Sequence, residues 1–207
     1  MKKYFFGILI IVFISGCYWG RNLEKNQKIK IIDDFIPDID NSISSVYINN
    51  NNADNYQTFC IDELRSNLEI NNVTLINNNT SQIDFTVVID KLLLQEKTKT
   101  ETVNDESSPY NGQSYELIVC DVDIKFKLYK GDVKDNYLID TYSINVNKEE
   151  KITNNRNLGD YMFGTNKDNS EYRQKLLSDD IFKTLSEKAG RRTSAKVTTK
   201  ISKRIKQ

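Results

Sequence analysis

Apolar and polar residues alternate most strongly in two segments in the middle of the chain, residues 115–130 and 136–148. Their apolar positions are Val122, Ile124, Phe126, Leu128, Tyr142, Ile144 and Val146. A period of two predicts β-strands with one buried and one solvated face, which favours antiparallel pairing. The sequence GDVKDN between the two segments predicts a hairpin turn.

Four further segments are predicted to be strands. Residues 28–35, 42–49 and 73–76 are short, and Pro37 separates the first two. Residues 83–95, IDFTVVIDKLLLQ, form a longer strand with Phe85, Val87 and Ile89 on one face. Residues 97–114 are polar and contain Pro109 and Gly112, which predicts a long hairpin connection or flap.

Helical periodicity precedes and follows these strands. Residues 56–69 place apolar side chains at spacings of three and four, and Asp54 is suited to the N-cap. The same periodicity runs from Leu177 to Ala189 and again from Val197 to Ile205, and Gly190 is expected to interrupt it. The pattern predicts an α+β fold: a single antiparallel or mixed sheet of about 4–6 strands, helices packed on one face, and a basic C-terminal helix.

The N-terminus has the pattern of a secretory signal. Two lysines precede an apolar run from Tyr4 to Ile14, which as a helix would be roughly 16 Å long against a bilayer core of about 30 Å. The sequence Ile14-Ser15-Gly16-Cys17 that follows resembles the lipobox of bacterial lipoproteins. The resemblance implies cleavage before Cys17 and modification of its thiol with lipid, including acyl chains such as palmitate. An ordinary signal peptide with a chance cysteine is the alternative.

These patterns divide the chain into a signal peptide (1–16), a lipidated tether (17–27), an α+β domain (28–189) and a basic helix or tail (190–207). The acyl chains would hold the mature protein on a membrane face. The residue after the cysteine is Tyr18 and not Asp. By the sorting rule known for enteric bacteria, this resembles a signal for the outer membrane. The resemblance therefore implies an outer-membrane lipoprotein, anchored on the periplasmic face.

The overall formal charge of zero hides an asymmetry. Residues 183–207 contain nine basic residues and one acidic residue, so this segment has a net charge of +8. Arg191, Arg192, Lys196, Lys200, Lys203 and Arg204 are therefore candidate contacts to an anionic partner. The alternative is a solvated basic helix lying on an acidic body. Nucleic acid is not an expected partner for an exported protein; anionic lipid and acidic protein surfaces are.

Two cysteines remain after Cys17. Cys60 lies in a predicted helix and Cys120 in a predicted strand, so a disulfide between them would join helix to sheet. Two small core residues are the alternative.

Candidate catalytic chemistry is sparse. The chain contains no histidine, which excludes Ser-His-Asp and Cys-His sites. Asp121 and Asp123 share the wet face of a predicted strand, as solvated carboxylates ordinarily do. Asp38, Asp40 and Asn41 lack the glycine and distal glutamate of an EF-hand loop. No cofactor, metal or enzymatic activity is expected.

The order of elements resembles a family. Cys17, a strand at Val46–Ile48, a helix at Tyr56–Glu69, a strand opening at SQIDFTVVID, two long antiparallel strands and a C-terminal helix follow one another. Over residues 42–189 this order resembles the lipopolysaccharide-assembly lipoprotein of the outer membrane and periplasmic lipoproteins similar to the TolB N-terminal domain.

The resemblance implies a non-enzymatic, lipid-anchored accessory protein that binds an outer-membrane or periplasmic partner in assembly or transport. The aromatic loop at 154–169 and the basic C-terminal helix are its expected contacts. The alternative is a ligand-binding or sensing lipoprotein that holds a glycan or lipid between sheet and helices. The oligomeric state stays open.

Overall fold

The computed structural model describes residues 22–40, 50–77, 82–108, 111–151 and 170–206. In chain order its elements are β1 (Gln27–Ile32), β2 (Asp38–Ile39), α1 (Asn50–Ile70), β3 (Val73–Leu75), β4 (Phe85–Thr102), β5 (Ser114–Lys130), the 3-10 turn η2 (Asp135–Tyr137), β6 (Leu138–Lys151) and α3 (Ser170–Ile205). The predicted strand at 42–49 lies outside the described residues.

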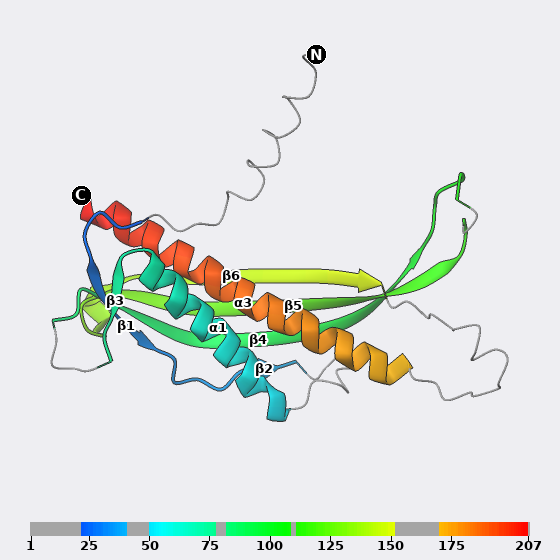
Figure 1. The fold of residues 1–207 in the computed structure, drawn as a ribbon, viewed down its shortest axis with the longest axis horizontal. Helices are drawn as coiled ribbons and strands as arrows, with labels where there is room; N and C mark the ends of the chain where they lie inside the picture. Colours follow the sequence, from blue (N-terminus) through cyan, green and yellow to red (C-terminus); the bar gives the residue numbers. More distant parts are fainter. Residues whose placement is uncertain (1–21, 41–49, 78–81, 109–110, 152–169, 207) are drawn as a thin grey trace, which may run out of the picture.

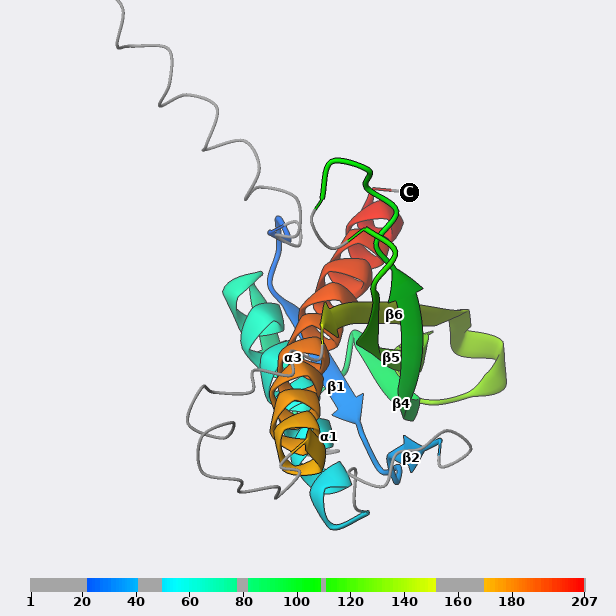
Figure 2. The same ribbon diagram turned by 90° about the vertical axis from the view of Figure 1, so that its right-hand side faces the viewer.

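The strands form one mixed sheet in the order β3-β1-β4-β5-β6. The short strand β2 pairs with β4 on the same edge as β1, further along β4. β1 and β2 run parallel to β4, whereas β4, β5 and β6 are antiparallel neighbours. Both helices lie side by side over one face of this sheet, and α3 is the C-terminal element (Figure 1, Figure 2). The α+β prediction, including helices packed on one face, is confirmed.

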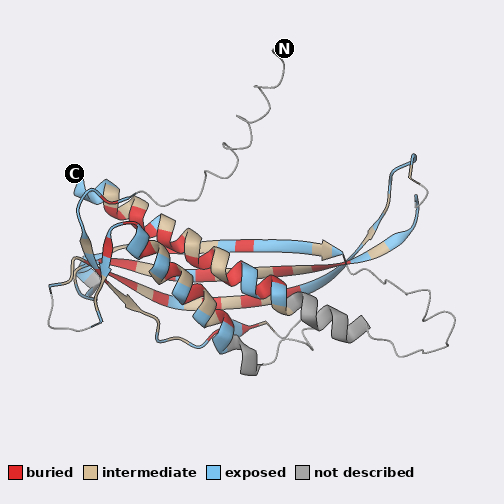
Figure 3. Cartoon of the chain, in the orientation of Figure 1, coloured by how far each residue is buried: buried red, intermediate tan, exposed pale blue. Residues whose placement is uncertain are grey.

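A single core lies between the helices and the sheet (Figure 3). The helices contribute Tyr56, Cys60, Ile61, Leu64, Leu68, Ile181, Phe182, Leu185, Ala189, Val197 and Ile201, all buried. The strands contribute the alternating positions predicted from the sequence, for example Val122, Ile124 and Phe126, which are fully buried. Burial of this apolar surface, at about 25 cal/mol per Å², is the main term that stabilises the fold.

The alternation along β4 changes phase at one point. Phe85, Val87 and Ile89 face the helices before it, and Leu92, Leu94 and Glu96 face them after it. The pairing with β5 is irregular between Ile89 and Lys91, so Asp90 is an extra residue on β4. A β-bulge of this kind lets two successive residues share the solvated face. It explains why Leu92 and Leu94 are buried, although strict alternation from Ile89 would place them on the solvated face.

The interruption of the C-terminal helix at Gly190 was predicted wrongly, because α3 is continuous from Ser170 to Ile205. Gly190 lies where α3 crosses α1. A Cβ added at this position would overlap the carbonyl oxygen of Cys60 and lie 3.0 Å from the backbone nitrogen of Leu64. The glycine therefore allows two helix backbones to approach closely, although its helix propensity is low.

The polar segment 97–114 connects two antiparallel strands, in agreement with the predicted hairpin connection, but the strands reach further into it than the predicted bounds. β4 continues to Thr102 and β5 begins at Ser114, so part of the segment is paired strand. Of the described residues, 103–108 and 111–113 lie between the two strands. The part of this hairpin that lies beyond the end of β6, residues 100–108 and 111–116, is hereafter the hairpin arm. It extends beyond the body at one end of the sheet (Figure 1).

Candidate functional surfaces

The basic residues of α3 that were predicted to bind an anionic partner do not form one free surface. Arg191 Nη1 lies 3.1 Å from Glu63 Oε1 of α1, in an ion pair. Arg192 Nη1 donates a hydrogen bond of 3.0 Å to the carbonyl oxygen of Asn145 in the edge strand β6. These two arginines therefore fasten α3 to its neighbours on both sides.

Lys196 and Lys200 contact the body as well. Their ammonium groups lie 5.3 Å and 5.0 Å from the ring centroid of Tyr142, within the range of cation–π attraction. Burial, followed by the nearby charge of Asp140, raises the pKa of the Tyr142 hydroxyl to about 12. This ring is therefore a neutral platform for the two lysines at physiological pH.

The last part of the predicted basic surface is exposed, as is Lys196. Lys203 and Arg204 are exposed in the final turn of α3. Beside them the ammonium of Lys206 lies 2.8 Å from Glu24 Oε1. The six predicted contacts thus divide into four residues that contact the body and two at the end of the helix. We call this end of the molecule, where α3 finishes, the α3 end.

The N-terminal part of the described chain is fastened at the α3 end. Leu23 is buried, and its backbone N–H donates to the Asn71 carbonyl at 3.2 Å. The Asn72 side-chain amide donates to the Leu23 carbonyl at 3.0 Å. Because Asn72 has a φ of 65°, its left-handed backbone turns the chain from α1 into β3 beside this contact. Residue 22 therefore leaves the body next to the last turn of α3.

The hairpin arm occupies the opposite end of the molecule (Figure 1). β6 ends at Lys151, opposite Leu117, so β4 and β5 continue beyond that point as a two-stranded ribbon. Most side chains on this ribbon are exposed, whereas those of the adjoining body are buried on the helix side (Figure 3). The arm therefore presents polar backbone and side chains on both faces.

Polar contacts hold the arm in shape. The Tyr115 hydroxyl donates to Glu101 Oε2 at 2.9 Å, and the Lys99 ammonium lies 2.5 Å from Glu101 Oε1. These two groups lower the pKa of the Glu101 carboxyl, the Lys99 hydrogen bond contributing most. At the tip, Gly112 N–H donates to the Val103 carbonyl at 2.8 Å, and Ser107 donates to Asp105. The arm is thus an ordered structure whose turn is closed by hydrogen bonds.

The two cysteines after Cys17 are free and buried. The disulfide that the sequence left open is not formed in the structure. The two cysteines are instead small core residues, which was the alternative. Burial raises the pKa of the Cys60 thiol to about 12. Burial and the charge of Glu96 raise the pKa of the Cys120 thiol well above its usual range. Neither sulfur is therefore a ready nucleophile.

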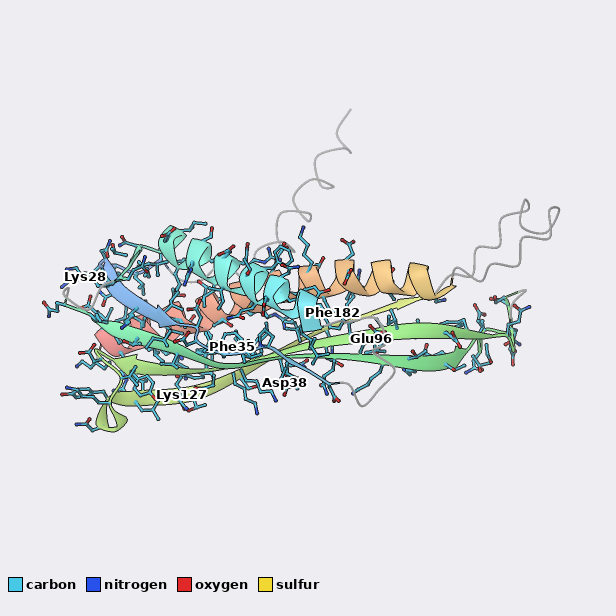
Figure 4. All side chains as sticks on the ribbon, turned by 90° about the horizontal axis from the view of Figure 1, so that it is seen from below. Lys28, Phe35, Asp38, Glu96, Lys127 and Phe182 are labelled. Atoms are coloured by element: carbon cyan, nitrogen blue, oxygen red, sulfur yellow. The ribbon has the colours of Figure 1, made fainter. Side chains whose placement is uncertain are left out.

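The candidate carboxylates lie on the face of the sheet opposite the helices, as predicted for Asp121 and Asp123. The side-chain amide of Asn145 donates to Asp123 Oδ1 at 3.0 Å. On the same side Asp38 pairs with Lys91 at 2.6 Å, and Gln95 donates to Asp40. Figure 4 shows Asp38 and Lys127 on this open side and Phe182 on the helix side. Within the described residues no group of three or more acidic or sulfur side chains is arranged to hold a metal ion.

One polar cluster was missed from the sequence. Tyr56 of α1 donates its hydroxyl proton to Asp179 of α3, and the charge of Glu96 on β4 also raises the pKa of Tyr56. Glu96 is 1% exposed and lies opposite Cys120, which in turn lies opposite Lys148 on β6. The signal for it was the phase change at Asp90, because counting from Leu92 and Leu94 places Glu96 on the buried face.

Several predicted features cannot be located in this structure. The lipobox with Cys17, the sorting residue Tyr18 and the aromatic loop at 154–169 lie outside the described residues. Among the helices of the described residues, none combines the length and the apolar character that a membrane span requires.

Comparison with known proteins gives a fold likeness without a family. No family model matches the chain, and no curated protein matches it in sequence. Among solved structures, a minor lipoprotein from Acinetobacter baumannii is 8% identical, with a TM-score of 0.42, over 84% of this chain and 92% of that one. The rare lipoprotein B from Shewanella oneidensis is 11% identical, with a TM-score of 0.38, over 86% and 99%.

A third solved structure is that of a protein from Helicobacter pylori described as a putative neuraminyllactose-binding hemagglutinin homolog. It is 12% identical, with a TM-score of 0.45, over 89% of this chain and 88% of that one. At these identities and TM-scores, none of the three likenesses assigns the chain to a family or gives it a function.

Proposed function

We propose that this protein is a non-enzymatic, lipid-anchored accessory protein of the bacterial envelope that binds an outer-membrane or periplasmic protein through its hairpin arm. The anchor is Cys17, on the strength of the lipobox-like sequence before it. The activity is adaptor binding in assembly or transport.

The observation that carries this proposal is the separation of two ends. Residues 22–24 leave the body at the α3 end, where Glu24 pairs with Lys206. The hairpin arm projects from the other end (Figure 1). A protein tethered at one end and extended at the other is suited to contact a second protein at a distance from its anchor. The exposed strand edges of a two-stranded ribbon offer unpaired backbone groups for that contact.

The core favours this proposal over a ligand carrier. A glycan or lipid held between sheet and helices would need space there. Instead, side chains of α1, α3 and the sheet form one buried cluster. α3 approaches α1 so closely at Gly190 that no side chain fits between them. The described interior is therefore a packed core, which suits a rigid adaptor better than a ligand carrier.

A crosslinking experiment tests the proposal. A photoreactive residue at Glu116 on the exposed arm is compared with one at Lys125 on the open face of the body, both in the lipidated protein within intact cells. We expect a single envelope protein to be captured from position 116 and not from position 125. The same position-116 variant carrying Cys17→Ala is the matched control, and the adduct should be lost.

Two results would overturn the proposal. Equal capture from both positions would show that the arm is not the contact. No capture from either, with a monomeric protein and an empty affinity purification from solubilised membranes, would favour the ligand-binding alternative.

A further inference from the structure

We propose that the α3 end is a lipid-binding surface that docks on anionic headgroups of the membrane carrying the anchor and holds the hairpin arm away from it. This inference rests on the lipid anchor of the proposed function. It adds a second, non-covalent attachment and an orientation. Three observations on described residues carry it.

The first observation is the distribution of exposed apolar side chains. Six large hydrophobic residues are exposed in the described part of the chain, and five of them lie at the α3 end: Ile70, Val133, Tyr137, Leu138 and Ile205. They come from three separate elements, namely the end of α1, the β5–β6 turn and the end of α3. The sixth, Ile36, lies in the loop between β1 and β2. Five exposed apolar residues at one end of the molecule make this end a candidate contact surface.

Register and contacts place these segments at one end. Tyr129 pairs with Leu138, and Lys130 pairs with Phe85, which is also opposite Ile29. Ile29 of β1 also pairs with Leu75 of β3, and β3 directly follows the end of α1. Lys206 of α3 forms an ion pair with Glu24, which lies just before β1. Figure 1 shows the end of α1, the end of α3 and the β5–β6 turn at the same side of the molecule.

The second observation is charge. The body carries an excess of acidic residues, yet residues 22–28, 69–70, 82–84, 130–138 and 202–206 at the α3 end contain seven basic and five acidic ones. At the end of α3, Lys203, Arg204 and Lys206 are exposed and lie next to the exposed Ile205 in the sequence. The Lys134 ammonium lies 5.6 Å from the Tyr137 ring centroid. Basic side chains around exposed aliphatic and tyrosine side chains match the headgroup region of a bilayer.

The third observation is reach. Cys17 precedes the buried Leu23 by six residues, which span at most about 22 Å when fully extended. The lipid must therefore enter the membrane within that distance of the α3 end. The hairpin arm, at the far end of the sheet, is out of range (Figure 1). The partner is accordingly an anionic bilayer, and not an acidic protein.

The first test measures this surface without the anchor. The mature chain carrying Cys17→Ala is sedimented with vesicles of phosphatidylcholine, with and without phosphatidylglycerol. We expect binding to the anionic vesicles only. The triple change Lys203→Gln, Arg204→Gln and Lys206→Gln should weaken that binding on the order of 100-fold, since each basic residue near a surface contributes about 1 kcal/mol.

Matched controls separate position from composition. The triple change Lys97→Gln, Lys125→Gln and Lys183→Gln removes the same charge at exposed positions away from the α3 end, and it should leave binding within a few-fold of the parent. Likewise Ile70→Ser with Ile205→Ser should weaken binding, whereas Ile36→Ser should not. If the two charge variants bind alike, or if the parent does not bind anionic vesicles, the inference is wrong. Neither result would depend on a protein partner.

The second test measures orientation in the lipidated protein. In a Trp19→Phe background, Tyr137→Trp is compared with Thr100→Trp on the arm, in vesicles containing brominated lipids. We expect quenching of the first and not of the second. Equal quenching would show a protein lying flat, and no quenching at position 137 would show that the α3 end does not touch the membrane.

Discussion

The Tyr56 hydroxyl donates a hydrogen bond to Oδ1 of Asp179, with 2.5 Å between the two oxygens, and so joins the first turns of α1 to α3. The Tyr56 ring also packs against Phe182, with ring centroids 5.8 Å apart. Burial, and then the hydrogen bond to Asp179, raises the pKa of Tyr56 well above its usual range. The contact therefore stays intact across the physiological pH range.

Removing this hydroxyl should destabilise the fold. Tyr56→Phe keeps the ring packing and loses a hydrogen bond to a carboxylate, so we expect the free energy of unfolding to fall by about 1–3 kcal/mol in urea denaturation. Tyr137→Phe, at an exposed tyrosine, is the control and should change it little. A double-mutant cycle with Asp179→Ala isolates the pair. Strictly additive effects would show that the two side chains are not coupled.

Gly190→Ala should also destabilise the protein, against the trend for helices. Alanine is favoured over glycine in a helix by about 1 kcal/mol. Here, however, the added methyl group would overlap the Cys60 carbonyl, and overpacking of this kind costs about 1–3 kcal/mol. Ser202→Ala in the same helix is the control and should be nearly neutral. A Gly190→Ala variant with a raised melting temperature would refute the close packing of α1 and α3.

The two buried thiols should be unreactive in the native state. In the Cys17→Ala protein at pH 8, we expect Ellman's reagent to label neither Cys60 nor Cys120 until denaturant is added. A reductant should leave the melting temperature unchanged, because no disulfide is present in the structure. Rapid native labelling of both cysteines would contradict their burial, and a reductant-sensitive melting temperature would revive the disulfide.

The same thiols should make the protein less stable at high pH. The Cys60 pKa is raised by burial to about 12, so above pH 9 the folded state keeps a proton that the unfolded state loses. Stability is then full below about pH 9 and falls by roughly 1 kcal/mol per pH unit per group as the pH rises toward 12. Cys60→Ala, measured by urea denaturation at each pH, should flatten this slope. An unchanged slope would assign the effect to Tyr56 or Cys120.

Two glycines with positive φ should differ in their effect on global stability. Gly131 has a φ of 75° and lies at the end of β5, where its N–H donates to the Asp84 carbonyl and its carbonyl accepts from Thr86. Gly112, with a φ of 79°, lies in the turn of the hairpin arm. Alanine in this conformation costs about 1–2 kcal/mol.

For Gly131→Ala we expect this cost in global unfolding. For Gly112→Ala it should appear instead as faster hydrogen exchange of arm amides, with global stability nearly unchanged, because the arm contributes little to the core. Equal loss of global stability in both variants would show that the arm unfolds together with the body.

The sequence predicted the helix-covered faces well, because alternation and helical periodicity report burial directly. Val122, Ile124 and Phe126 on β5, and Leu64 and Leu68 on α1, lie where the pattern placed them. The pairing partners of the strands could not be predicted from the sequence. Nothing in a single sequence shows that β1 pairs in parallel with both β3 and β4.

The errors had local physical causes. Gly190 was interpreted from its own propensity, whereas its role depends on α1, more than a hundred residues earlier in the chain. The polarity of residues 97–114 was taken to indicate a hairpin connection or flap over the whole segment, although a two-stranded ribbon exposed on both faces is also polar. The surface at the α3 end was not found because its exposed residues come from three separate elements.

The extra residue at Asp90 restricts how β4 can change in length. Because Asp90 and Lys91 both occupy the solvated face, deletion of either one would restore regular alternation and leave Ile89 and Leu92 facing the helices. Deletion of a single residue anywhere else beneath the helices would invert the faces of the strand beyond it. In the hairpin arm, where both faces are exposed, this restriction does not apply, and one residue added to each strand lengthens the arm by about 3.4 Å. The hairpin arm is the part of the sheet in which related chains can differ in reach without altering the core.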